Sequence, residues 1–191
     1  PDSMPNLIGA LRIFGKDRFR DGQLEVVLKA LQGNSVLVVR PTGSGKSLCF
    51  QVPVLLSPGT GYVISPLKAL MSDQVSELQR LKIPATFINS DLNPREKGLR
   101  YKLLKNKALK FLYVAPERFD PSKVKQEEIN KITQICASYL VVDEAHCIDR
   151  WGNDFRPSYS QLGEVKKRLG GVPVLAFTAT AGQRVQRRIL D

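Results

Sequence analysis

The chain has 191 residues, with 29 Lys or Arg and 18 Asp or Glu, so its formal net charge is +11 at pH 7. This length predicts one domain, 1–191, with a hydrophobic core large enough to be stable without a disulfide bond or a bound metal ion. The three cysteines are odd in number and lack zinc-ligand spacing, which argues against a disulfide framework and a zinc site. The sequence shows no signal-peptide pattern and no apolar stretch of about 20 residues, the length of a membrane span.

These features predict an intracellular protein without zinc and without a membrane partner. Residues 1–3, which precede Met4, look like an expression remnant.

The basic excess is uneven along the chain. Seven basic residues and one acidic residue lie between positions 95 and 110, and smaller basic clusters lie at 166–168 and 184–188. A protein this basic is a candidate to bind a polyanion such as nucleic acid. The alternative is that each cluster is a solvated helix face that keeps the protein soluble.

Apolar residues at helical spacing predict helices over 6–14 and 23–32 near the N-terminus. In the second helix, Leu24, Val27, Leu28 and Leu31 mark the face expected to be buried. The apolar run that begins at residue 35 predicts a fully buried strand, and residues 46–56 after the next loop predict a helix. Further strands are expected at 61–65, 85–89, 111–115, 139–142 and 172–177, and further helices at 67–81, from Pro94 onward, at 127–137 and at 158–169.

Strands that are apolar throughout and alternate with helices indicate a parallel sheet covered on both faces. We therefore predict an α/β fold, a three-layer α/β/α sandwich. Ligands of such sheets bind at the carboxyl ends of the strands. The polar motifs of this chain fall at these ends, at residues 41–47, 66–68, 116–118, 143–146 and 178–180.

The loop after the first strand has the order strand, glycine loop, Lys-Ser and helix that a P-loop requires. Its glycines permit a tight nest of backbone N–H groups for phosphates, Lys46 reaches the β- and γ-phosphates, and the Ser47 hydroxyl ligates Mg²⁺. Arg40 stands where the strict motif has Gly, and the alternative is an ordinary turn with a surface lysine. The predicted nucleotide-binding residues of the loop are Thr42, Gly43, Ser44, Gly45, Lys46 and Ser47.

Two acidic residues, Asp143 and Glu144, directly follow the apolar strand 139–142. A carboxylate at this position can hold Mg²⁺ beside a P-loop. Its neighbour can polarise the water that attacks the γ-phosphate. An Asp-Glu pair is usually solvated, but after a buried strand in a P-loop chain it indicates ATP hydrolysis.

Together these residues resemble the motifs of RecQ helicases, a family of superfamily-two DNA helicases. Residues 143–146 read Asp-Glu-Ala-His, the DEAH form of motif II, and 147–159 resemble the aromatic-rich loop that follows it. Residues 19–23, 41–51, 65–75, 115–118 and 177–181 resemble further motifs in family order, over nearly the whole chain. The resemblance implies a RecA-like P-loop NTPase domain of a 3′–5′ helicase, which uses ATP and Mg²⁺ to translocate on single-stranded DNA and unwind forked DNA. It also implies action in the nucleus of a eukaryote, or in the cytoplasm or nucleoid of a prokaryote.

The resemblance also implies roles for individual residues. Arg20 and Gln23 would contact adenine, while the aromatic-rich loop would link the nucleotide to the DNA site. The implied catalytic residues are Lys46, Asp143, Glu144 and His146, with Ser47 and Asp143 as Mg²⁺ ligands. The implied DNA-binding and coupling residues are Lys68, Ser72, Arg118, Trp151, Phe155, Arg156, Thr178 and Thr180.

The sequence departs from the family at several positions. RecQ proteins usually carry Ser-Gln at 149–150, His at Asn153 and commonly Glu at Ser158, and many have an aromatic residue at Lys16. The neutral amide of Asn153 removes the titratable, ring-shaped contact that a histidine would supply. The coupling of ATP hydrolysis to DNA that the resemblance implies is therefore in question at this position. Lys16 cannot stack on adenine as an aromatic ring does, so base binding is expected to depend on Arg20 and Gln23.

A helicase motor also needs a second RecA-like domain, but only 11 residues follow Thr180. We therefore expect this chain to be the first motor domain of a longer protein, weak in ATP binding and hydrolysis and unable to unwind DNA alone. Two alternatives stay open. One is a nucleotide-gated nucleic-acid-binding module without hydrolysis, and the other is a P-loop kinase or unrelated ATPase whose basic face serves solubility.

Overall fold

The computed structural model describes residues 6–40, 45–145 and 157–179, without the side chains of 157–161. Six strands form one sheet in the order β1-β6-β5-β2-β4-β3, and each neighbouring pair is parallel. The strands are β1 Val36–Val39, β2 Thr60–Ile64, β3 Ala85–Ile88, β4 Phe111–Val114, β5 Ala137–Val142 and β6 Val174–Thr178. The helices are α1 Leu7–Ile13, α2 Gln23–Leu31, α3 Lys46–Leu56, α4 Lys68–Arg80, α5 Pro94–Lys105, α6 Gln126–Ile132 and α8 Pro157–Arg168, with a 3-10 turn, η1, at Pro116–Phe119.

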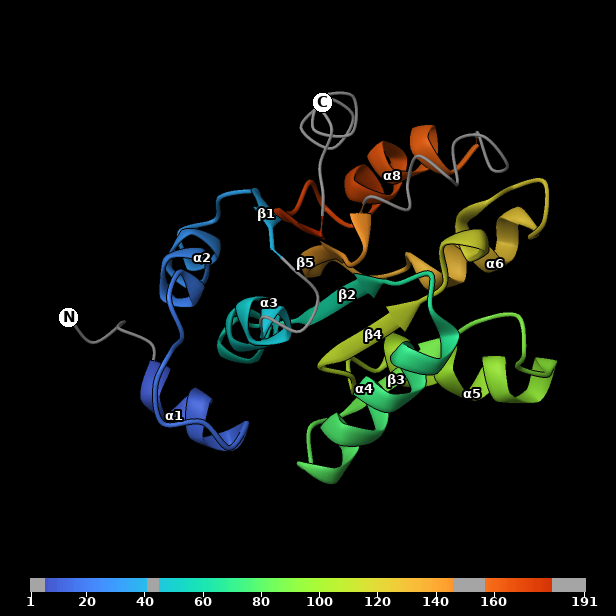
Figure 1. Ribbon diagram of the computed structural model, residues 1–191. Coiled ribbons are helices and arrows are strands. Elements are labelled where there is room, and N and C mark those ends of the chain that lie inside the picture. Colours follow the sequence, from blue (N-terminus) through green and yellow to red (C-terminus); the bar gives the residue numbers. More distant parts are fainter. Residues whose placement is uncertain (1–5, 41–44, 146–156, 180–191) are drawn as a thin grey trace.

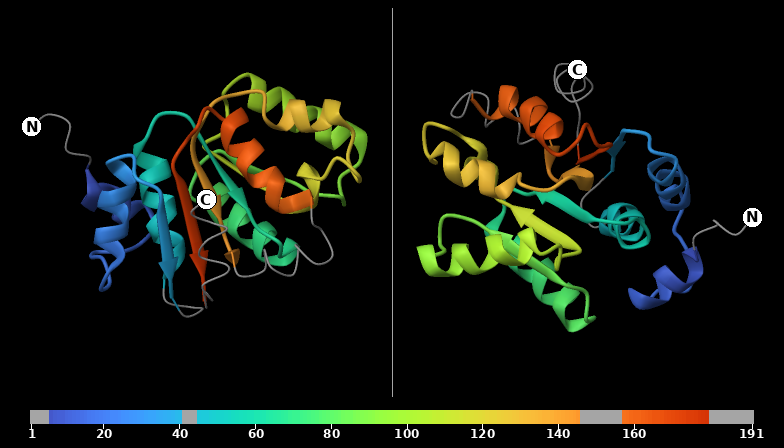
Figure 2. Two further views of the ribbon diagram at one scale, coloured as in Figure 1. Left: turned by 90° about the horizontal axis from the view of Figure 1, so that it is seen from above. Right: turned by 180° about the vertical axis from the view of Figure 1, so that it is seen from behind.

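The helices cover both faces of the sheet (Figure 1). Helices α2, α3 and α4 pack on one face and α5, α6 and α8 on the other. Successive strand residues point to opposite faces, so in β2 Val63 joins the core under α3 while Ile64 joins the core under α6. Figure 2 shows the sheet between the two helical layers from further sides. The predicted three-layer α/β/α architecture is confirmed.

The first strand differs from its prediction. It is an edge strand, paired with β6 alone among the described strands, and Val39 is 50% exposed. An apolar run predicts that a strand is present but carries no information about strand order. The expectation of a fully buried strand was therefore wrong.

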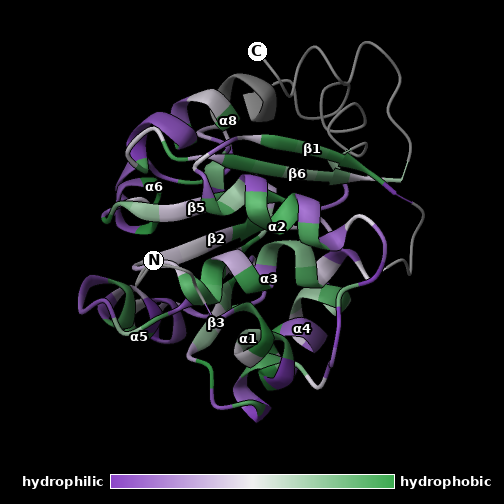
Figure 3. Ribbon diagram, turned by 90° about the vertical axis from the view of Figure 1, so that its left-hand side faces the viewer, coloured by the Kyte–Doolittle hydropathy of each residue, from purple (hydrophilic) through white to green (hydrophobic). Residues whose placement is uncertain are grey.

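Helix α2 buries only part of the face that was predicted. Val27 is fully buried and Leu31 packs partly buried against the core beside α1 and α3, as predicted. Leu24 and Leu28 are instead 40% and 39% exposed, and Gln23, Val26 and Ala30 are buried. Ala30 belongs to the core beside β1 and α3, where a small side chain allows close approach. Figure 3 shows hydrophobic and hydrophilic residues mixed along the α1, α2 and α3 side of the molecule.

The helix predicted over 127–137 is shorter than expected. Helix α6 ends at Ile132, and β5 begins at Ala137, which pairs with Thr60 of β2. Residues 133–136 are neither helix nor strand, so the end of the predicted helix is a connection that leads into β5. The predicted start of α5 is confirmed: the Asn93 side chain accepts from the Glu96 N–H at 2.9 Å, and Pro94 opens the helix.

In the described part of the chain, none of the helices is long and apolar enough to span a bilayer.

Candidate functional site

The carboxyl edge of the sheet brings the end of β5 to the first residue of α3. Lys46 opens α3, and its ammonium Nζ lies 2.6 Å from Glu144 Oε1 and 3.0 Å from Asp143 Oδ1. The three side chains are nearly buried, with exposed fractions of 11%, 10% and 1%. The structure therefore joins the predicted P-loop lysine to both predicted acidic residues, which lie almost 100 positions away along the chain.

Burial and charge act against each other in this cluster. Burial alone would lower the pKa of Lys46, but the hydrogen bond to Glu144 and the charge of Asp143 outweigh it, so the pKa is raised. The pKa of Asp143 is also raised, mainly by its burial, although Lys46 opposes that effect. Lys46 therefore stays charged, and Asp143 is a carboxylate whose negative charge depends on a nearby cation.

The two acidic residues differ in backbone conformation and hydrogen bonding. The Asp143 N–H donates to the Ile64 carbonyl at 2.9 Å, which continues the pairing of β5 with β2. Glu144 then takes a left-handed conformation, with φ of 55°, and its N–H donates to Asp143 Oδ1 at 3.0 Å. A non-glycine residue in this conformation is strained, and such strain is concentrated at functional sites.

Gln23 connects the start of α2 to the start of α3. Its Nε2 donates to the Gly45 carbonyl at 2.8 Å, and its Oε1 accepts from the Arg20 N–H at 2.7 Å. The carboxamide is completely buried, but each of its polar atoms keeps capacity for one more hydrogen bond. Its predicted contact with adenine remains a prediction. The link to Gly45, which the sequence did not predict, attaches this segment to the phosphate loop.

A hollow of about 240 Å³ lies where these segments meet. Its walls include Arg20, Gln23 and Ser47, all predicted to bind nucleotide or Mg²⁺, together with Lys16. Sequence reasoning missed Phe14, which lines the same hollow. The phenyl ring offers an apolar surface two positions before Lys16. The far wall comes from the C-terminal end of α4, through Glu77, Leu78 and Leu81.

Arg40 also has a structural role. Its guanidinium donates to the Asp21 carbonyl in the loop before α2. It thus joins the end of β1 to the segment that carries Arg20 and Gln23. The residue that departs from the strict P-loop pattern helps to hold the nucleotide segments together.

The candidate DNA-binding residues in the described chain lie in different surroundings. Lys68 is 43% exposed and contacts Asp91 and Ser90 at 3.0 and 2.7 Å, while Ser72 is exposed one turn further along α4. Arg118 is buried, lies 4.0 Å from Glu128, and has no hydrogen-bond partner for its Nε among the described residues. Thr178 is buried at the end of β6. Lys68 and Ser72 are thus accessible to a phosphate backbone, whereas Arg118 would have to move.

Several predicted residues lie outside the described residues. They are the expression remnant at 1–3, the loop residues Thr42, Gly43 and Ser44, and His146, Asn153, Trp151, Phe155, Arg156 and Thr180. The basic cluster at 184–188 lies there too.

The family described as DEAD/DEAH box helicase matches residues 20–188. The chain belongs to this family. Its DEAH sequence begins directly after β5 and supplies Asp143 and Glu144.

The curated relatives of this family member are DNA helicases. It is 42% identical over 181 residues to the RecQ-like DNA helicase BLM of Xenopus laevis, with 93% of this chain and 13% of that protein covered. It is 43% identical over 188 residues to the ATP-dependent DNA helicase RecQ of Haemophilus influenzae, with 97% and 30% covered. The resemblance to RecQ helicases is confirmed, and the chain spans less than a third of either relative.

Solved structures support the fold. The DUF1998 helicase MrfA bound to DNA and AMPPNP aligns with a TM-score of 0.75 at 24% identity, over 99% of this chain and 28% of that one. The Mycobacterium smegmatis helicase Lhr bound to ssDNA and AMP-PNP aligns with a TM-score of 0.71 at 19% identity, over 96% and 25%. The predicted RecA-like fold is therefore confirmed.

Replacing Gly45 with Ala should damage the link between α2 and the phosphate loop. Gly45 has φ of 77°, and an added Cβ would lie 2.6 Å from Gln23 Nε2. We expect a loss of about 2 kcal/mol in the free energy of unfolding, about half from the left-handed backbone and half from the displaced hydrogen bond. Chemical denaturation measures this loss. The matched control is Gly15→Ala, which has φ of 74° and nothing within 4 Å of the added Cβ. Equal losses in the two variants would show that Gln23 is not constrained by Gly45.

Proposed function

We propose that this chain is the nucleotide-binding motor domain of a RecQ-like DNA helicase. In the complete protein it would hydrolyse ATP to translocate 3′ to 5′ along single-stranded DNA inside the cell. The observation that carries the proposal is the contact of Lys46 Nζ with both Asp143 and Glu144, within 3.0 Å. Phosphoryl transfer needs a cation for the phosphates, an acidic metal ligand and a group that orients water, and these three side chains would supply them.

The same contacts suggest how the site would respond to nucleotide. The Lys46 ammonium balances one of the two negative charges that Asp143 and Glu144 can carry. ATP would draw the ammonium toward its phosphates, which leaves Asp143 in need of another cation. Ser47 and Asp143 offer a hydroxyl and a carboxylate, the hard oxygen donors that Mg²⁺ prefers. The bound ion would neutralise phosphate charge, while Glu144 positions the attacking water.

The adenine would occupy the hollow between the start of α2 and the end of α4. Gln23 can present one further donor and one further acceptor there, and Phe14 supplies an apolar wall. This arrangement would compensate for Lys16, which cannot stack. A binding module without hydrolysis has no need for Glu144 beside Lys46, so the geometry favours the hydrolase.

A motor of this kind acts across a cleft, and we propose that a second RecA-like domain of the same protein closes the site. The test compares the complete protein with this chain. ATP turnover that rises with added single-stranded DNA, together with unwinding of forked DNA, is expected only of the complete protein. Efficient unwinding by the 191-residue chain alone, or no ATP turnover by the complete protein, would contradict the proposal.

Lys68 provides a test of the DNA path. On a single strand, each phosphate contact contributes about 0.7 to the slope of log affinity against log salt. We expect Lys68→Gln to lower this slope by about 0.7 in fluorescence anisotropy titrations with an oligothymidine. The control Lys29→Gln removes another exposed lysine that is paired with an acidic residue, Glu25, and should leave the slope unchanged. A Lys68→Gln slope equal to that of the wild type would remove Lys68 from the DNA path.

A further inference from the structure

A buried tyrosine hydroxyl contacts the helix that carries two of the candidate DNA-binding residues. Tyr113 belongs to β4, is 1% exposed, and packs in the core under α3 and α4. Its hydroxyl donates to Gln74 Oε1 of α4 at 2.8 Å. Helix α4 is continuous from Lys68 to Arg80, so Gln74 shares one rigid element with Lys68 and Ser72. The hydrogen bond therefore joins this helix to the centre of the sheet.

The same hydroxyl is contacted from the nucleotide side. Burial raises the pKa of Tyr113, and a side-chain hydrogen bond with Gln51 of α3 opposes that rise. A hydrogen bond that lowers the pKa of a phenol is one that its oxygen accepts, so the Gln51 amide donates and the hydroxyl donates onward to Gln74. Gln51 also lines the hollow in which we place the adenine. The hydroxyl is thus the middle member of a chain of hydrogen bonds from this hollow to α4.

This chain of hydrogen bonds has two discrete arrangements. Because burial raises its pKa, the phenol stays protonated at neutral pH and has one proton to donate. It can donate to Gln74 or to the carboxamide oxygen of Gln51, but not to both. A nucleotide that turned the Gln51 carboxamide would therefore change the hydrogen bond that Gln74 receives. A buried polar group that loses its partner costs free energy, so such a change would favour a different position of α4.

The alternative is that the contact only satisfies a buried hydroxyl. Tyr62 illustrates that case in the neighbouring strand β2, on the opposite face of the sheet. It is fully buried, and its hydroxyl donates to the Ile132 carbonyl at 2.5 Å, at the end of α6, where none of the predicted site residues lies. Tyr113 instead contacts side chains on two helices that each carry predicted site residues.

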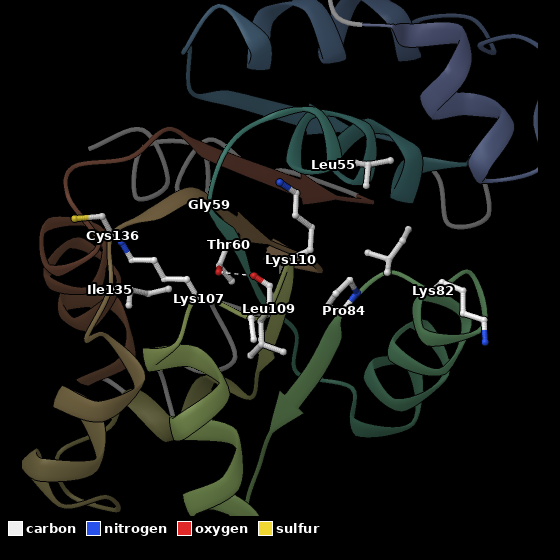
Figure 4. Close-up of a pocket in the computed structure, with 12 residues that line it drawn as sticks. Leu55, Gly59, Thr60, Lys82, Pro84, Lys107, Leu109, Lys110, Ile135 and Cys136 are labelled. Carbon is white, nitrogen blue, oxygen red and sulfur yellow. Dashed lines mark hydrogen bonds between the residues drawn. The ribbon is translucent and has the colours of Figure 1, made fainter.

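A hollow at the other edge of the sheet offers no comparable connection. It has a volume of about 670 Å³ and is lined by Leu55 in the last turn of α3 and by Lys82 just after α4. Its lysines, Lys82, Lys107 and Lys110, point apart (Figure 4), and Lys110 donates to the Ser57 carbonyl. The polar groups of the described lining residues do not converge there.

We infer that Tyr113 is a positioning residue that couples nucleotide binding beside α3 to DNA binding on α4. It touches neither ligand and acts through Gln51 and Gln74. The inference rests on the proposed helicase function and assigns part of its coupling to one hydroxyl group. Coupling of this kind is reciprocal, because each ligand changes the affinity for the other by the same factor.

The test is Tyr113→Phe in the complete protein, which removes the hydroxyl and leaves the ring in the core. ATP turnover without DNA should stay within twofold of the wild type, since no proposed catalytic group is altered. Stimulation of turnover by oligothymidine should fall about fivefold, the equilibrium equivalent of one hydrogen bond. In fluorescence anisotropy titrations, AMPPNP should change the affinity for oligothymidine less in this variant than in the wild type.

The matched control is Tyr62→Phe, which removes another buried hydroxyl with one hydrogen bond. It should lower the melting temperature but leave the stimulation and the AMPPNP response unchanged. Gln74→Met removes the acceptor and keeps Tyr113 in place, so it should reproduce the effects of Tyr113→Phe. The double variant should lose no more stimulation than either single variant, because both changes remove the same hydrogen bond. If Tyr113→Phe melts far below the wild type, Gln74→Met decides.

The outcomes separate this inference from the proposed function. Unchanged stimulation in Tyr113→Phe, an equal loss in Tyr62→Phe, or additive losses in the double variant would overturn the inference alone, because the wild type still responds to DNA. A wild-type protein whose ATP turnover did not respond to oligothymidine would contradict the proposed function and the inference with it.

Discussion

Lys46→Met is expected to lower both the stability and the activity of the protein. The substitution leaves Asp143 and Glu144 buried without the ammonium that contacts them at 3.0 and 2.6 Å. Removing one partner of a buried ion pair costs about 3 kcal/mol, which corresponds to a decrease of about 6–12 °C in melting temperature for a chain of this size. ATP turnover of the complete protein should fall at least about 100-fold, the loss typical when one group that stabilises transition-state charge is removed.

The stability loss should depend on pH in a defined direction. Burial already raises the pKa of Asp143 above its ordinary value of 3.8, and Lys46 opposes this effect. Without Lys46 the pKa rises further, so the folded protein takes up a proton more readily than the unfolded chain. The penalty is therefore fully present above the folded pKa and is relieved as pH falls toward the unfolded value. The melting-temperature difference from the wild type should be larger at pH 8 than at pH 5.

Two variants separate this effect from a general loss of packing. Lys46→Met/Asp143→Asn removes one of the two buried carboxylates that Lys46→Met leaves unpaired. At pH 8 it should therefore recover most of the melting temperature lost in Lys46→Met, while ATP turnover stays lost. Lys29→Met removes an exposed lysine that is paired with Glu25, and should shift stability by less than about 0.5 kcal/mol. A pH-independent deficit in Lys46→Met would contradict the proposed cause.

The chemistry of the site was predictable because it follows local order in the chain. Lys46 and Ser47 follow a strand and a glycine loop, and Asp143 and Glu144 directly follow another strand. Parallel strands place their carboxyl ends at one edge, so both motifs were expected at the same edge of the sheet. The resting contact of Lys46 with both acidic residues did not follow from the motifs, because it depends on side-chain positions across the edge.

The buried face of α2, predicted correctly at Val27 and Leu31 but not at Leu24 and Leu28, shows where local patterns fail. Helical spacing treats Gln23 as polar and therefore exposed, but hydrogen bonds to Gly45 and from Arg20 allow it to be buried. With Gln23 facing inward, Leu24 and Leu28 turn outward. The pattern was misleading at the residue predicted to contact nucleotide, as expected where a functional residue violates the apolar periodicity.

The edge position of β1 and the walls of the nucleotide hollow depend on long-range arrangement. Strand order places β1 beside β6 rather than beside β2, and no local pattern specifies that choice. The hollow takes Phe14 from the end of α1 and Leu81 from the end of α4. Both residues resemble ordinary core positions in the sequence, so only the fold identifies them as part of this site.

Glu144→Gln is expected to abolish turnover while nucleotide binding survives. If Glu144 orients and polarises the attacking water, the neutral amide should lower kcat for ATP about 10²- to 10⁴-fold. Lys46 retains its contact with Asp143 at 3.0 Å, and an amide oxygen can still accept from its ammonium. The melting temperature of this chain and the affinity of the complete protein for a fluorescent ADP analogue should therefore change little.

The informative comparison is with Asp143→Asn, its immediate neighbour. That variant removes the proposed Mg²⁺ ligand, so it should weaken Mg²⁺-dependent nucleotide binding as well as turnover. Because Asp143 is buried with a raised pKa, the neutral amide should not destabilise the nucleotide-free chain. Loss of kcat alone in Glu144→Gln and loss of both parameters in Asp143→Asn would assign water activation to one residue and metal binding to the other. Unchanged turnover in Glu144→Gln would remove it from catalysis and revive the binding module that never hydrolyses ATP.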